Sequence, residues 1–177
     1  MTFDRRDNEP YLKLNDQLYQ RTLSGSMATN HALFHSIVIE AMKMFADVPG
    51  WEERTGAYWA IAGIYTEESY AAGYAGNNGY SAGEQFRLRC KEKLARLASH
   101  RHHLSSAESR NPDRLQFGGA IRTNWYMLSM SGLPEDGDEI CVLKFAVERS
   151  WLTDDQAKQI AEISDNWLWK EFSELLF

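Results

Sequence analysis

The chain has 177 residues, 44% of them hydrophobic, and a formal net charge of −6. This length supports one sizeable hydrophobic core, so we expect a single domain over residues 1–177. We expect neither export nor membrane insertion, because the N-terminal residues are charged and no apolar run approaches the roughly 20 residues of a membrane span. The two cysteines, Cys90 and Cys141, lack CxxC spacing and predict small core residues in a reduced, cytoplasmic protein.

The first half of the chain predicts three helices. One begins near Pro10 and ends before the Ser-Gly-Ser break at 24–26. The second, residues 30–47, is apolar nearly all round, which predicts a central, heavily buried helix. The third, residues 51–72, is rich in glycine and alanine, and such small side chains let another helix approach closely. A loop is expected at 73–80, where three glycines and two asparagines gather.

The second half predicts further helices from caps and apolar spacing. Ser81 and Glu84 form a capping box ahead of a helix over 81–104, and Thr153 with Gln156 forms a second one. Other helices are expected from Asn111-Pro112, over 138–151 (where β-branched residues leave a strand open as the alternative) and from about Asp165. We therefore expect an all-α fold, either one compact bundle of about seven or eight helices or two sub-bundles.

Charge is distributed unevenly along the chain. Residues 81–122 carry a formal charge of +5, and the remainder carries −11. Within the 81–104 helix, apolar side chains at helical spacing predict a seam that faces the core, formed by Phe86, Cys90, Leu94 and Leu97. A separate basic stripe consists of Arg89, Lys93, Arg96 and His100, and Arg101 follows it. A positive stripe with this spacing can follow a nucleic-acid phosphate backbone.

Three roles are open for the basic stripe: pairing with acidic residues of the same chain, binding a phosphate backbone, or docking on another protein. Residues 135–177 carry eleven acidic and four basic side chains and could supply the internal partner. The same acidic region could bind a basic protein, and Asp154, Asp155 and Glu162 are the residues expected to do so.

Candidate catalytic and metal-binding groups are few. His31 and His35 are one helical turn apart and could supply two metal ligands, but no third ligand follows at a recognisable spacing. Arg96 and His102 have an R-x5-H spacing that loosely resembles the Arg/His motif of HEPN-type ribonucleases, and no second motif accompanies it. We therefore expect no metal site and no cofactor, and a metal-dependent or HEPN-like enzyme stays open as the third hypothesis of function, behind two non-enzymatic ones.

A resemblance to a known family begins at Trp51. The sequence W-E-E-R at 51–54, with A-Y at 57–58 and A-G-I-Y at 62–65, resembles a pattern in the small helical subunit of type I CRISPR Cascade complexes. A glycine-containing loop, a basic helix and an aromatic tail at 167–172 follow in a similar order. The resemblance implies a non-catalytic, two-bundle, all-α subunit that contacts guide RNA or displaced DNA through backbone phosphates. The chain departs from that family in being acidic overall.

Two hypotheses of function follow. The leading one is a non-enzymatic helical binding protein, a subunit of a ribonucleoprotein complex that contacts the nucleic-acid backbone through the basic stripe and Arg101. The alternative is a small acidic inhibitor, such as an immunity protein, an antitoxin or a phage-encoded anti-CRISPR. It would dock on a basic nuclease or effector through Asp154, Asp155 and Glu162. Neither hypothesis involves a membrane, and both leave the oligomeric state open.

Overall fold

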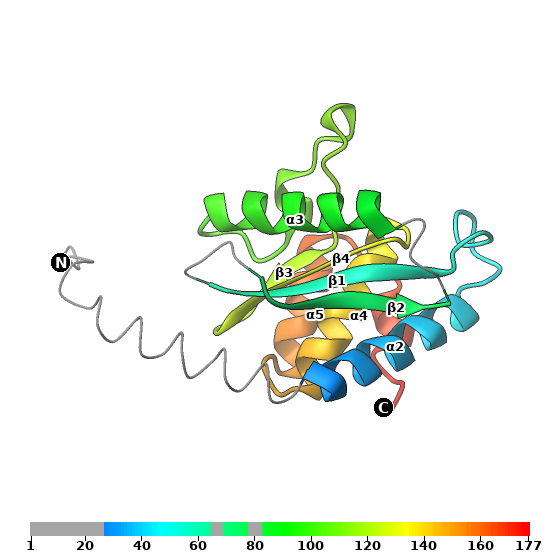
Figure 1. Ribbon diagram of the computed structural model, residues 1–177. Coiled ribbons are helices and arrows are strands. Elements are labelled where there is room, and N and C mark those ends of the chain that lie inside the picture. The colour runs from blue at the N-terminus through cyan, green and yellow to red at the C-terminus, as the bar shows by residue number, and fades with distance from the viewer. Residues whose placement is uncertain (1–26, 65–68, 78–82) are drawn as a thin grey trace, which may run out of the picture.

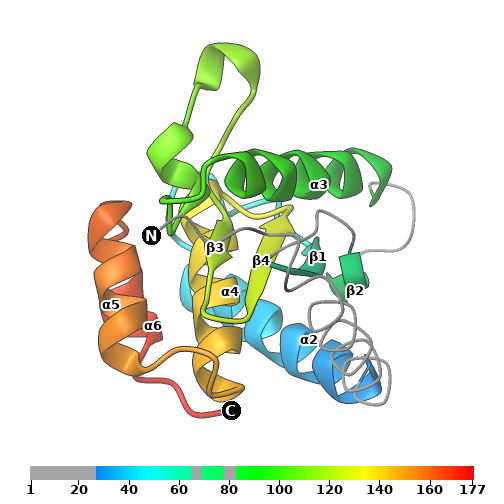
Figure 2. The same cartoon turned by 90° about the vertical axis from the view of Figure 1, so that its left-hand side faces the viewer.

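The computed structural model describes residues 27–64, 69–77 and 83–177. These residues form a four-stranded antiparallel sheet covered by helices on both faces (Figures 1 and 2). The elements, in chain order, are α2 (Met27–Met44), β1 (Gly56–Gly63), β2 (Ser69–Gly76), α3 (Gly83–Ser99), the 3-10 turns η3 (Ser106–Ser109) and η4 (Pro112–Arg114), β3 (Ala120–Arg122), β4 (Tyr126–Ser131), α4 (Glu135–Glu148), α5 (Asp154–Ile163) and α6 (Trp169–Phe172). The strand order across the sheet is β2-β1-β4-β3.

The core has two layers, one on each face of the sheet. Figure 1 shows α3 across one face and α2 with α4 on the other. Alternate residues of β1 divide between the layers: Trp59 and Ile61 pack with α2 and α4, while Ala60 and Ala62 pack with α3. Helices α5 and α6 lie outside α4, away from α3 (Figure 2). Every residue of β1 is therefore buried.

The expected all-α helical bundle is wrong, because residues 56–63 and 69–76 form the antiparallel strands β1 and β2, and residues 120–122 and 126–131 form β3 and β4. A strand covered on both faces shows no alternation of polar and apolar residues, so the main sequence signal for a strand is missing from β1. The glycines and alanines of β1 allow helices to approach both faces of the sheet closely. The same small residues are also typical of a helix packed against another helix, which is why the sequence predicts a helix here. The two-bundle architecture implied by the CRISPR-subunit resemblance is wrong for the same reason, since the described part of its motif, residues 51–54, 57–58 and 62–64, lies in the turn before β1, on β1 and directly after it.

Several local predictions are confirmed. The seam of α3 faces the core, with Cys90, Leu94 and Leu97 buried. The capping box of Thr153 and Gln156 begins α5, and of the helix predicted over 138–151, residues 138–148 are helical within α4. In contrast, the helix expected from Asn111-Pro112 is wrong, because these residues begin only the short 3-10 turn η4. The expected first helix and the capping residue Ser81 lie outside the described residues.

No helix in the described ranges is both long enough and apolar enough to cross a bilayer. The two cysteine thiols are unpaired and fully buried, on opposite faces of the sheet. Burial raises the pKa of Cys90 to about 12 and raises the pKa of Cys141 well above its usual value. Because the thiolate is the reactive form, both groups are protected chemically as well as sterically.

We therefore expect the native chain to show no reaction with a thiol reagent such as Ellman's reagent near neutral pH, and two thiols per chain to react after unfolding in guanidinium. The colour change of the reagent measures both values. Rapid reaction of one thiol in the native state would contradict the burial of that cysteine, and Cys90→Ala and Cys141→Ala would each show which one reacts.

Candidate functional site

The structure places half of the basic stripe inside the protein. The Lys93 side chain is buried, and its Nζ donates hydrogen bonds to Asp138 Oδ2 at 2.8 Å and to the Met130 carbonyl at 2.7 Å. Asp138 belongs to α4, so the acidic C-terminal region does supply an internal partner for the stripe. Asp138 Oδ1 also accepts a hydrogen bond from the Leu133 amide. Burial raises the pKa of Asp138, and the neighbouring Lys93 opposes that shift.

The backbone beside this pair leaves no room for a side chain. Gly119 has φ +106°, and a Cβ there would lie 2.6 Å from Asp138 Cβ and 2.8 Å from Lys93 Nζ. Only glycine adopts this conformation without strain and lets the pair close. The loop before β3 and the buried pair are therefore structurally dependent on each other.

Arg96 is also buried and serves the protein's own loop. Its guanidinium pairs with Glu92 and donates to the carbonyl oxygens of Ser106 and Phe117. These contacts fasten the loop that contains η3 and η4 to α3. Of the residues predicted to bind nucleic acid, Arg89, His100 and Arg101 are exposed, whereas Lys93 and Arg96 are not. The HEPN-like pair loses its arginine to the same internal contacts, so Arg96 does not reach an outside phosphate in this structure.

Glu139 is a buried carboxylate that the sequence did not single out. It accepts hydrogen bonds from the hydroxyls of Ser105 and Ser164 and from the Asn166 side-chain amide. Among the described residues no cation pairs with it, and burial raises its pKa to about 7. It borders a cavity of about 180 Å³ that is also lined by Arg110, Glu135, Asp136 and Asp165. The carboxylate therefore joins α4 to the start of η3 and to the end of α5.

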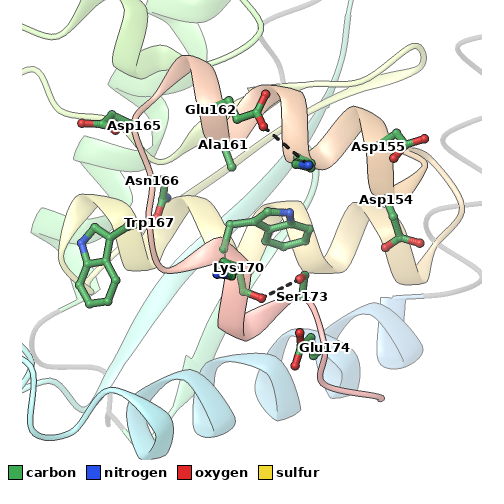
Figure 3. A pocket seen from close by; sticks show the side chains of 12 residues that line it. Asp154, Asp155, Ala161, Glu162, Asp165, Asn166, Trp167, Lys170, Ser173 and Glu174 are labelled. Atoms are coloured by element: carbon green, nitrogen blue, oxygen red, sulfur yellow. Dashed lines mark hydrogen bonds and ion pairs between the residues drawn. The ribbon is translucent and has the colours of Figure 1, made fainter.

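The acidic residues predicted to bind a protein line one groove between α5 and α6. The groove has a volume of about 690 Å³. Its lining comprises five carboxylates (Asp154, Asp155, Glu162, Asp165, Glu174), two lysines (Lys158, Lys170), two tryptophans (Trp167, Trp169) and Ala161, Asn166 and Ser173. Figure 3 shows Asp154 and Asp155 at one end of this acidic groove and Asp165 and Trp167 at the other. The formal charge of its lining is therefore −3.

The turn between α5 and α6 shapes the groove. The amide of Asn166 donates to the Ala161 carbonyl and that of Asp165 donates to the Glu162 carbonyl, which is the Schellman pattern of a helix end. Asp165 occupies the left-handed position of this motif, at φ +53°, where glycine is the usual residue. Glycine would adopt this backbone conformation with less strain, but aspartate adds a carboxylate to the lining of the groove.

Trp167 is the large apolar group that the groove presents to solvent. Its side chain is 58% exposed, whereas Trp169 is 5% exposed and lines the same groove. Sequence reasoning selected the acidic residues and missed the tryptophan, whose signal was an aromatic residue within an acidic segment. Exposed tryptophan next to charge is typical of protein-binding surfaces.

His31 and His35 lie together on α2, with ring centroids 6.4 Å apart. His35 Nδ1 accepts a hydrogen bond from the Gly76 amide at 3.2 Å, so one of its ring nitrogens is occupied. Within the described residues, no group of three or more histidine, cysteine or acidic side chains is arranged to hold a metal ion. The two histidines thus have no described third ligand.

Comparison of the chain with protein-family models, with curated proteins and with solved structures gives no match.

Proposed function

We propose that this chain is a non-enzymatic protein-binding module, an acidic inhibitor of the immunity-protein or antitoxin kind, that docks on a basic nuclease or effector through the acidic groove. The observation that carries the proposal is the gathering of five carboxylates and the exposed Trp167 around one groove. Complementary charge speeds the encounter with a basic partner, and a large aromatic side chain supplies a buried anchor once the complex has formed.

The geometry of the groove favours a partner segment that combines positive charge with apolar surface. Lys158 Nζ is 3.9 Å from Glu162 Oε1, and both side chains are largely exposed to water. This ion pair therefore neutralises little of the negative charge of the groove. Asp154, Asp155 and Asp165 have no ion pair among the described residues. Lysine or arginine side chains of a partner would pair with these carboxylates, while its apolar side chains cover Trp167.

Binding of a phosphate backbone has less support, because Lys93 and Arg96 are committed to internal contacts. The remaining exposed members of that set, Arg89, His100 and Arg101, are too few to follow a duplex over several phosphates. We also propose a cytoplasmic location, which the two unpaired thiols support.

The partner is identified by crosslinking from the groove. A photo-reactive residue placed at Lys170, which lines the groove, should capture a basic protein in the native host, and the product should survive nuclease treatment. The same residue placed at Asp113, an exposed position on η4, is the control and should not capture it. A product that nuclease destroys would instead support the nucleic-acid hypothesis.

The affinity for that partner tests the groove residues. The triple variant Asp154→Asn, Asp155→Asn, Glu162→Gln should bind at least about tenfold more weakly, mainly through slower association and with less dependence on salt. The control triple variant Glu53→Gln, Asp113→Asn, Glu171→Gln makes the same change in net charge at exposed positions outside the groove and should bind normally. Equal weakening by both triple variants would contradict a site at the groove.

Asp165 separates binding from stability. Asp165→Gly removes a groove carboxylate and at the same time suits the left-handed backbone of the Schellman turn. We therefore expect weaker partner binding together with unchanged or higher thermal stability. A residue with only a structural role would leave binding unchanged.

A further inference from the structure

A second hollow lies on the other side of α4, and the proposed function does not use it. It is a cleft of about 380 Å³ where α3 passes the N-terminal end of α4, which also contains the buried Lys93–Asp138 pair. Its lining residues are Arg54, Phe86, Arg89, Lys93, Phe117, residues 131–136 and Asp138. Four segments of the chain thus meet there: the turn before β1, helix α3, the loop before β3, and the connection from β4 into α4.

Three of the six charged side chains that line this cleft are already paired inside the protein. Lys93 and Asp138 neutralise each other. Glu135 pairs with Arg110 at 2.6 Å and also accepts a hydrogen bond from the Gly118 amide. Asp136 is half-buried and has no ion pair among the described residues, and burial together with Glu135 raises its pKa. The cations of the cleft that no described carboxylate pairs with are two guanidinium groups, Arg54 and Arg89, which outnumber the Asp136 carboxylate.

Arg54 is held in place by neutral groups. Its Nε donates to the Gly50 carbonyl at 2.9 Å, and its Nη1 donates to the Gly132 carbonyl at 3.1 Å. These bonds fix the plane of the guanidinium without cancelling its charge, and no described residue accepts a hydrogen bond from Nη2. Arg89, on α3, is exposed and has neither an ion pair nor a side-chain hydrogen bond among the described residues. A fixed arginine and an adaptable one therefore border the same cleft.

The cleft also has aromatic walls. Phe86 comes from α3 and Phe117 from the loop before β3, and both are partly exposed. The Phe117 backbone is anchored, because its carbonyl accepts a hydrogen bond from Arg96. Leu133 and Pro134 add apolar surface. Apolar walls with a few fixed polar groups are the usual composition of a small-molecule site.

From these contacts we infer that the cleft binds a small aryl anion, with its phosphate or carboxylate at Arg54 and Arg89 and its ring against Phe86 and Phe117. Arginine suits this role because its planar fork can donate two hydrogen bonds to either anion. The cleft and the acidic groove share no lining residue, so a test of this site is independent of the proposed function.

Calorimetric titration of the intact chain with phenyl phosphate and with benzoate tests the inference. At least one should bind with one-to-one stoichiometry and a dissociation constant below about 1 mM. Inorganic phosphate should bind at least about fivefold more weakly, because it lacks the ring, and benzyl alcohol should not bind, because it lacks the charge. The comparison of phenyl phosphate with benzoate identifies which anion the two arginines prefer.

Two variants locate the site. Arg89→Ala should weaken binding at least about fivefold and leave the fold intact, because Arg89 is exposed. Lys91→Ala removes an exposed charge from the same helix outside the cleft and should bind as the parent does. The inference is overturned by absence of saturable binding of both aryl anions up to about 5 mM, by equal affinity of Arg89→Ala and the parent, or by inorganic phosphate binding as tightly as phenyl phosphate.

Discussion

Lys93→Met should lower the free energy of unfolding by about 3–5 kcal/mol, the range found when one partner of a buried ion pair is removed. The variant leaves Asp138 buried without its cation and leaves the Met130 carbonyl without its donor. Lys91→Met, two residues away on the exposed side of α3, is the control and should change stability by less than about 0.5 kcal/mol. Urea unfolding followed by tryptophan fluorescence measures both.

The cost of Lys93→Met should depend on pH. Burial already raises the pKa of Asp138, and loss of Lys93 raises it further, so the folded variant retains a proton that the unfolded chain releases. Its stability is therefore highest in acid and is lost as the pH rises through the folded-state pKa. The second change Asp138→Asn removes the unpaired charge while keeping an acceptor for the Leu133 amide, and should restore most of the loss. If Lys93→Met lowered the free energy of unfolding only slightly, and by the same amount at every pH, the result would contradict a buried Lys93–Asp138 ion pair.

Glu139→Gln should stabilise the protein by about 3 kcal/mol near pH 8 and have little effect near pH 4. The pKa of Glu139 is raised from 4.5 to about 7 by burial, so between these values the folded chain binds a proton that the unfolded chain lacks. Stability contributed by the protonated group is therefore complete below pH 4.5 and is lost as the pH rises to about 7. Chemical unfolding at several pH values measures the difference between the variant and the parent.

The surroundings of Glu139 can accept an amide. Ser164 Oγ already has a second acceptor in the Ile160 carbonyl at 3.2 Å, so its hydroxyl can turn and accept a hydrogen bond from glutamine. The charged groups that line the same cavity (Arg110, Glu135, Asp136 and Asp165) are unchanged by the substitution. Glu171→Gln, at an exposed position, is the control and should not alter the pH dependence. Identical pH profiles for Glu139→Gln and the parent would show that Glu139 is not the titrating group.

The sequence predicted the amphipathic parts of this fold and failed for the sheet. Helix α3 has one buried seam, which gives a 3.6-residue period, and α5 has a capping box, so both could be predicted from local patterns. Strand β1 is covered on both faces and contains residues compatible with either a strand or a helix contact. Only its pairing with β2 and β4 distinguishes the two, and that pairing is not local.

The same division applies to the candidate sites. The acidic composition of α5 pointed to Asp154, Asp155 and Glu162, and the structure brings them together with Trp167 at one groove. The buried Lys93–Asp138 pair could not be predicted, because its members lie on helices far apart in the sequence. Glu139 was not singled out, and its one signal is weak: it stands directly before the apolar run at 140–143, which is buried in α4.

The arrangement of β1 between β2 and β4 also determines when the chain can fold during its synthesis. Tyr58 pairs with Tyr74 across a short hairpin, but it pairs with Ser131 only after α3 and the loops beyond it have been made. Bringing β1 and β4 together closes a long loop, and the entropic cost of that closure must be overcome before the two strands pair. A ribosome-bound chain that ends before β4 therefore exposes one edge of β1 and part of both core layers, which makes this nascent stage the one most dependent on protection from aggregation.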